Sequence, residues 1–155
     1  MLFRSPYVTY FHSSKYISDL ANGNICVAIG FSGDVFQAKA RAEDAKKGVN
    51  IAYIVPKEGT NVWMDNICIP VGAPHPENAH AFLNHILYKE VNAEIASTIH
   101  YATADKAAQA LIPAEDLSNP EIYPPEEVIA ASESLTDVGD FTPVYDKAWT
   151  EVQAA

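Results

Sequence analysis

Basic residues are scarce in this sequence. Its 155 residues include 10 Lys and Arg against 20 Asp and Glu, which gives a formal net charge of −10. That balance disfavours nucleic acid and anionic membrane surfaces as partners, because both are themselves negatively charged. It is compatible with cationic ligands. The length and the hydrophobic content of 48% suit one globular domain with its own core.

Long apolar runs are also missing, and none approaches the roughly 20 residues that a helix needs to cross a bilayer. The first eleven residues, MLFRSPYVTYF, lack a basic segment followed by an apolar one, so we expect no signal peptide in this chain. The two cysteines, Cys26 and Cys68, lie inside strand-like runs. We expect buried free thiols, and a disulfide stays open as the alternative.

Catalytic and metal-binding motifs are absent as well. The sequence has neither HExxH nor CxxC, and His75, His80 and His85 are rotated by about 140° from one to the next around a helix, so they share no face. Residues 30–34 read GFSGD, which departs from GxSxG because Asp34 stands in place of the last glycine. There is no GxGxxG or P-loop pattern. We therefore expect no enzyme, no metal site and no cofactor.

The chain is organised around the stretch Ile25–Ala38, ICVAIGFSGDVFQA. Its first five residues form an apolar, partly β-branched run, which predicts a buried strand. Gly30 and Gly33 allow a tight turn, and Asp34 stands at the expected N-cap of a helix. The turn therefore presents the ring of Phe31 and the carboxylate of Asp34 at the end of a strand, where open α/β sheets bind ligands.

A second ring and carboxylate follow the predicted strand Val49–Val55. Trp63 and Asp65 lie two residues apart, so an extended segment directs both to one side. An aromatic face attracts an organic ammonium ion, and a carboxylate accepts its N–H groups in charge-assisted hydrogen bonds. Two such pairs predict a site for a cationic amine. A plain structural interpretation stays open for each pair: Asp34 caps its helix, and Trp63 belongs to the core.

The rest of the chain predicts helices separated by short strands and loops, which indicates an α/β protein. Pro6–Phe11 is predicted to be extended, Asn66–Pro70 to be a further short strand, and Pro113–Pro125 to be a loop. From apolar spacing and end signals, helices are predicted over residues 15–22, 35–47, 77–88, 89–100, 105–111, 126–135 and 142–153.

Several runs, in the same order and spacing, resemble the periplasmic polyamine-binding proteins. They are Tyr10–Ser14, Asp19–Gly23, Val27–Gly30, Gly33–Val35, Pro56–Gly59, Ala81–Asn84, Lys106–Ala108 and Asn119–Pro125. The resemblance covers nearly the whole chain from about Pro6. Within that family the chain looks closest to the putrescine-binding receptors of bacterial ABC importers.

The resemblance implies the C-terminal part of a type II periplasmic-binding fold, in which two α/β lobes close on a ligand as a clamshell. The fold would be incomplete in this chain, because proteins of the family are much longer. Residues 1–48 would form the end of the second lobe, 49–110 a crossing strand and a return through the first lobe, and 111–155 closing helices on the second lobe. The other cleft residues would lie in a missing N-terminal half.

Carried over by position, the resemblance implies five ligand-binding residues: Phe31, Asp34, Trp63, Asp65 and Tyr101. Asp34 and Asp65 fall on the two ligand carboxylates of the family, Trp63 on an aromatic position that is often Phe or Trp, and Tyr101 on a tyrosine that lines the cleft. Phe31 is a departure, since the family usually has a ligand-stacking tryptophan there. The smaller ring has a weaker quadrupole and attracts a cation less.

The resemblance thus implies a solute-binding protein of the periplasm that takes a di- or polyamine, first putrescine and otherwise spermidine. Its partners would be that ligand, the membrane permease of an ABC importer and the missing N-terminal half, with no nucleic acid. Three alternatives stay open. They are a receptor of the same fold for another small solute, a fragment that lost the cleft and serves as an interaction domain, and a small enzyme.

Overall fold

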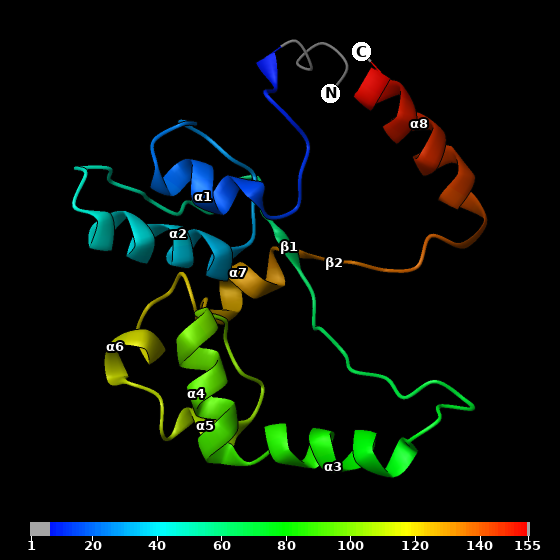
Figure 1. Cartoon of the computed structure of the whole chain (residues 1–155). Coiled ribbons are helices and arrows are strands. Elements are labelled where there is room, and N and C mark those ends of the chain that lie inside the picture. Colours follow the sequence, from blue (N-terminus) through cyan, green and yellow to red (C-terminus); the bar gives the residue numbers. More distant parts are fainter. Residues whose placement is uncertain (1–6, 155) are drawn as a thin grey trace.

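The structure is a computed structural model that describes residues 7–154, so Pro6, the first residue of the predicted extended segment, lies outside it. Helices make up most of its regular structure (Figure 1). The α-helices are α1 (Lys15–Ala21), α2 (Ser32–Ala45), α3 (Pro76–Ile86), α4 (Lys89–Ile99), α5 (Lys106–Gln109), α6 (Ala114–Leu117), α7 (Glu126–Ala130) and α8 (Thr142–Ala154). The strands are β1 (Asn61–Val62) and β2 (Glu133–Ser134), and the 3₁₀ helix η2 (Gly139–Phe141) leads into α8. Within residues 7–154, no helix has the length and apolar character that a membrane span requires.

The helical predictions are confirmed, with shorter bounds at several ends. The helices α1, α2, α3, α4, α5, α7 and α8 occupy the seven segments expected to be helical. Pro76 begins α3, because its fixed φ and missing N–H suit the first helical position. The prediction of a loop over Pro113–Pro125 is wrong at α6, where Pro113 precedes a first turn with two acidic residues. β2 replaces the last predicted turn of α7.

The three predicted strands are not formed. Residues 25–29, 49–55 and 66–70 are assigned to no strand and pair with no neighbour among the described residues. A strand is held by hydrogen bonds to an adjacent strand, so an apolar run without a neighbour stays open to solvent. Val27 is 84% and Ile29 96% exposed, which makes the prediction of a buried strand wrong for this stretch.

The strand ladder that the described residues do form is short and parallel. Asn61 of β1 lies opposite Glu133 of β2, and Val62 lies opposite Ser134. This pair connects the segment just before Trp63 with the segment after α7 (Figure 1). It therefore helps to fix where the second predicted ring and carboxylate enter the structure.

The two cysteines lie in the unpaired apolar runs and are exposed like other residues of those runs. Cys26 and Cys68 are both free thiols, as expected, and the alternative of a disulfide is wrong. Both are exposed, so the prediction that they are buried is also wrong. The cause is the missing cover over residues 25–29 and 66–70 rather than any polar partner.

The first of two small cores lies between α1 and α2, which pack along each other (Figure 1). Tyr16 and Ala21 of α1 and Val35, Ala38 and Ala42 of α2 are buried there. The α2 residues recur at three- and four-residue spacing, so they form one face of the helix. This packing places α1 beside the turn that starts α2, where the first predicted ring and carboxylate lie.

The second core lies around α4 and α5. Ala93, Ala96 and Ala108 are buried there with Ile112, and Tyr123 packs against them. α4 also contacts α2, so the residues that follow α4 reach the start of α2. This contact brings Tyr101 from a distant part of the sequence to the same turn.

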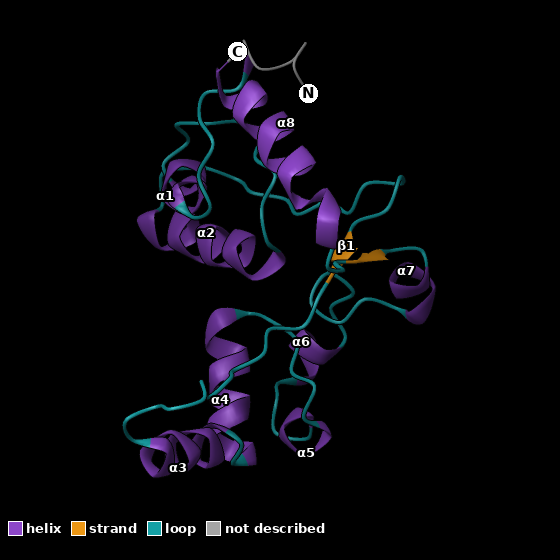
Figure 2. Ribbon diagram, turned by 90° about the vertical axis from the view of Figure 1, so that its right-hand side faces the viewer, coloured by secondary structure: helices purple, strands orange, loops and turns teal. Residues whose placement is uncertain are grey.

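The last helix, α8, follows the extended segment after α7 that contains β2 (Figure 1), and it lies at the end of the molecule opposite α3 (Figure 2). Trp149 of α8 meets Phe11 edge-on, with ring centroids 5.0 Å apart. Phe141 of η2 and Val144 and Tyr145 of α8 are exposed. α8 therefore contributes an aromatic contact far along the chain from the candidate site.

Candidate functional site

The two predicted aromatic residues lie against each other. The ring centroids of Phe31 and Trp63 are 5.2 Å apart, and the ring planes meet at 66° in an edge-to-face arrangement. Such a pair leaves ring faces free for a further contact. Phe31 is 42% and Trp63 39% exposed, so Trp63 does not belong to the buried core and that alternative is wrong.

Asp34 does not cap its helix. α2 begins at Ser32 with Phe31 in the N-cap position, and Asp34 lies in the first turn. Its carboxylate turns to two phenols instead. The Tyr16 hydroxyl donates to Oδ2 at 2.6 Å, and the Tyr101 hydroxyl donates to Oδ1 at 3.3 Å. The predicted capping role is therefore wrong, and Asp34 is the centre of a hydrogen-bonded group that joins three parts of the chain.

Both phenols remain hydrogen-bond donors at neutral pH. Burial, together with the charge and hydrogen bond of Asp34, raises the pKa of Tyr101 to about 12. The same causes, burial first, raise the pKa of Tyr16 still further above its usual range. A phenol that keeps its proton can only stabilise the ionised carboxylate beside it. The Asp34 carboxylate therefore accepts a hydrogen bond from each of the two phenols.

Asp65, the second predicted carboxylate, lies near the same group. Its charge contributes to the raised pKa of Tyr101, which places it within electrostatic range of that phenol. Asp65 is exposed, and among residues 7–154 its carboxylate has no hydrogen-bond partner. The ion pairs of the described residues, Lys15–Asp19 and Lys89–Glu90, include neither Asp34 nor Asp65. Neither carboxylate of the candidate site is therefore paired with a cation in the described part of the chain.

The structure thus brings all five predicted site residues together, from α2, from the segment after β1 and from the segment after α4. It adds a sixth, Tyr16, which the sequence pattern marks only as an apolar position of a short helix. A tyrosine on the buried face of a helix needs a partner for its hydroxyl, and that requirement is the one available signal. The identity of the partner, Asp34, depends on how α1 packs on α2.

Two glycines make the arrangement possible by having no side chain. A Cβ on Gly30 would clash with the edge of the Tyr16 ring, 2.6 Å from Cζ. A Cβ on Gly33 would overlap the Tyr101 ring and lie 2.6 Å from the carbonyl oxygen of Ile99. Neither glycine has a positive φ. The prediction that they serve a special backbone angle is therefore wrong, and close approach of two tyrosine rings explains them.

We expect Gly33→Ala to lower the free energy of unfolding of the chain by about 1–3 kcal/mol, because the added methyl must displace the Tyr101 ring or the Ile99 backbone. The neighbouring change Ser32→Ala is the control, since it adds no volume to α2. It should change the free energy by less than about 0.5 kcal/mol. Urea unfolding followed by circular dichroism at low protein concentration measures both. Equal stability of the two variants would contradict the close contact.

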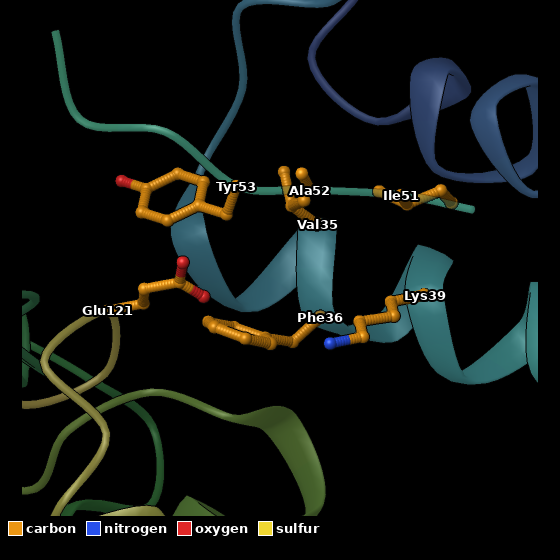
Figure 3. A pocket seen from close by; sticks show the side chains of 7 residues that line it. All are labelled: Val35, Phe36, Lys39, Ile51, Ala52, Tyr53 and Glu121. Carbon is orange, nitrogen blue, oxygen red and sulfur yellow. The ribbon is translucent and has the colours of Figure 1, made fainter.

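A separate pocket lies on another side of α2 and contains none of the five predicted residues. Its volume is about 160 Å³, and it is lined by Val35, Phe36, Lys39, Ile51, Ala52, Tyr53 and Glu121. Figure 3 shows the Glu121 carboxylate beside the rings of Tyr53 and Phe36. Burial and the charge of Glu121 raise the pKa of Tyr53. The pocket carries Lys39 as well as Glu121, so it lacks the unbalanced negative charge of the candidate site.

Metal binding finds no support in the described part of the chain. Residues 7–154 contain no group of three or more His, Cys, Asp or Glu side chains placed to hold an ion. Two carboxylates, two rings and two protonated phenols suit a different ligand. Their chemistry matches an organic cation with N–H donors.

Comparison with known proteins agrees with this chemistry. A family model for bacterial extracellular solute-binding proteins matches residues 4–125. The putrescine-binding periplasmic protein SpuD of Pseudomonas aeruginosa is 46% identical over 150 residues, which are 96% of this chain and 41% of that protein. The putrescine-binding periplasmic protein PotF of Escherichia coli is 47% identical over 151 residues, which are 96% of this chain and 40% of that protein.

More distant relatives include the spermidine/putrescine-binding periplasmic protein of Escherichia coli, 30% identical over 149 residues, 96% of this chain and 41% of that protein. The chain therefore spans about two fifths of the length of the curated relatives it matches. Identity is higher to the two relatives named for putrescine alone than to the one named for spermidine and putrescine.

Proposed function

The chain belongs to the family of bacterial extracellular solute-binding proteins, and we propose that it supplies one side of a putrescine site in a periplasmic receptor that delivers its ligand to an ABC permease. The relatives at 46% and 47% identity, both named for putrescine binding in the periplasm, support the ligand and the compartment. Binding, rather than catalysis, is the whole activity of such a receptor. The chain would carry no enzyme function.

The observation that carries the proposal is the pairing of uncompensated carboxylates with exposed rings. A diamine has an ammonium group at each end, and Asp34 and Asp65 offer one counter-charge for each. The two phenols on Asp34 occupy one acceptor position on each oxygen, and a carboxylate has about four such positions. The oxygens can therefore still accept from an ammonium group. The rings of Phe31 and Trp63 would take the alkyl chain and the cationic ends.

We further propose that the complete receptor has a type II, two-lobed fold. In that fold residues 1–48 and 111–155 would belong to the second lobe, and residues 49–110 would cross to the first lobe and return. The unpaired runs at 25–29, 49–55 and 66–70 would then find neighbouring strands in the part of the receptor that this chain does not cover. Closure of the lobes by a hinge motion would bury the ligand between them.

The test uses a completed receptor, defined as this chain joined in one polypeptide to the N-terminal part of the Pseudomonas aeruginosa relative that it does not cover. Putrescine, cadaverine, spermidine and several amino acids are screened by thermal shift, because a ligand that binds the native state raises its melting temperature. We expect putrescine to give the largest shift. A shift with amino acids alone would indicate a receptor for another solute, and no shift with any compound would indicate an interaction domain.

We expect Trp63→Leu in the completed receptor to weaken putrescine binding by roughly 1–2 kcal/mol, because leucine keeps apolar bulk but has no π face. Trp149→Leu is the matched control, since it removes another half-exposed indole from an edge-to-face pair with a phenylalanine, away from the site. Phe31→Trp should bind putrescine equally well or better, because indole attracts a cation more strongly. Calorimetry measures affinity and thermal unfolding measures stability. A collapse of stability in Trp63→Leu with unchanged affinity would make Trp63 structural.

A further inference from the structure

We propose that Tyr16 is a positioning residue of the amine site, whose single hydroxyl fixes both the carboxylate of Asp34 and the backbone from which the Phe31 ring extends. The inference rests on the proposed function and adds a residue outside the five predicted from the sequence. Tyr16 belongs to α1, so it acts through its neighbours on α2 and does not itself belong to the ring and carboxylate pairs.

The hydroxyl of Tyr16 is held on two sides. It donates to Asp34 Oδ2 at 2.6 Å and accepts the backbone N–H of Phe31 at 2.9 Å. The side chain is 4% exposed, so water cannot easily replace either bond. Because the N–H of Phe31 occupies a lone pair of the phenol oxygen, the phenol proton is directed to the carboxylate. Both partners are thereby fixed relative to each other.

The two phenols on Asp34 differ in how firmly they hold it. Tyr16 lies at 2.6 Å and Tyr101 at 3.3 Å from their respective carboxylate oxygens. Tyr16 is buried in the core between α1 and α2, whereas Tyr101 follows α4 and is only partly buried. We therefore assign the positioning of Asp34 to Tyr16. Tyr101 has the longer bond and is better placed to shift toward a ligand.

Gly30 contributes to the same positioning of Asp34 and Phe31. A Cβ there would clash with the Tyr16 ring and its hydroxyl, so the ring reaches Asp34 only because residue 30 has no side chain. Gly30 therefore packs against the ring of Tyr16, and the backbone N–H of Phe31 donates to its hydroxyl. Packing and hydrogen bonding both hold the turn in one conformation, and a site held before the ligand arrives loses less entropy on binding.

The chain contains a matched control for the hydroxyl of Tyr16. Tyr10, which precedes α1, donates a hydrogen bond of 2.8 Å to Asp19 of α1, so this is a phenol–carboxylate pair of the same kind. Asp19 also accepts a hydrogen bond from Asn24 and forms an ion pair with Lys15, so its position does not depend on Tyr10 alone. Among the described residues, no side-chain hydrogen bond joins Tyr10 or Asp19 to a carboxylate of the candidate site.

The experiment compares Tyr16→Phe and Tyr10→Phe in the completed receptor by calorimetric titration with putrescine. Each change removes one hydroxyl and keeps the ring, so both variants should fold. We expect Tyr16→Phe to weaken binding about tenfold, the range for loss of a hydrogen bond to a charged group. Tyr10→Phe should stay within about twofold of the unsubstituted receptor. Equal affinities for all three proteins would overturn the inference.

Two further readouts separate positioning from general stability. In an Asp34→Asn background, Tyr16→Phe should cause a smaller further loss of affinity than in the unsubstituted receptor, because the part of its effect that acts through the Asp34 charge is gone and only its bond to the Phe31 backbone remains. The amide of Phe31 should exchange its hydrogen faster in Tyr16→Phe and not in Tyr10→Phe. Additive losses, or unchanged exchange at Phe31, would overturn the inference.

The outcomes also distinguish this inference from the proposed function. If the unsubstituted completed receptor binds none of the amines, the proposed function fails and the inference fails with it. If that receptor binds putrescine and Asp34→Asn abolishes binding while Tyr16→Phe leaves it unchanged, the inference alone is overturned.

Discussion

Asp34→Asn and Asp65→Asn are each expected to weaken putrescine binding by the completed receptor by about 2–5 kcal/mol, or roughly 30- to 5,000-fold. Each change leaves a buried ammonium group without its counter-charge while keeping the size of the side chain. For Asp34 the effect should be larger, because its carboxylate is already held by two phenols and its loss also frees Tyr16 and Tyr101. Calorimetric titration measures both variants.

Asp19→Asn is the control for the carboxylate changes. Asp19 also accepts a hydrogen bond from a tyrosine, Tyr10, and lies on α1 away from the rings of the site. Its removal should change putrescine affinity by less than about twofold. A change of less than about threefold for both Asp34→Asn and Asp65→Asn would contradict their assignment as ligands and leave the diamine without its counter-charges.

The helices could be predicted from the sequence, and the residues of the candidate site could be proposed from it, because both kinds of signal are local. Apolar spacing and Pro76 place α3 without any knowledge of its neighbours. The ring and carboxylate pairs at residues 31 and 34 and at residues 63 and 65 are likewise visible in short stretches. The structure then brings both pairs and Tyr101 together, and their role as ligand-binding residues stays a prediction.

The strands, the burial of the cysteines and the hydrogen bonds of Asp34 could not be predicted, because they depend on residues far away in the sequence. An apolar run such as residues 25–29 predicts a strand. A strand forms only beside another strand, and no strand of the described residues lies next to this run. The same absence exposes Cys26, whose burial was inferred from the run around it. Asp34 stands where a helix N-cap is expected. Its carboxylate accepts hydrogen bonds from the hydroxyls of Tyr16 and Tyr101 and none from the helix backbone. The packing of α1 on α2 decides this contact, and nothing near residue 34 reveals it.

The second large effect concerns the part of the receptor that this chain does not cover. Small-molecule sites generally enclose most of the ligand surface, whereas here Phe31, Trp63 and Asp65 stand open to solvent. The unpaired runs also expose Val27 and Ile29, and open edges with apolar side chains promote association. We therefore expect the chain alone to bind putrescine about a thousandfold more weakly than the completed receptor, and to oligomerise.

The most direct test adds, as a separate chain, the N-terminal part that we propose for the complete receptor. Light scattering follows the size of this 155-residue chain, and calorimetry follows putrescine binding, before and after addition of the N-terminal part of the Pseudomonas aeruginosa relative. The account predicts association and binding no tighter than about millimolar at first, then a defined complex that binds at about micromolar strength. A monodisperse monomer that binds putrescine at micromolar strength by itself would contradict it, because the site would then be complete within this chain.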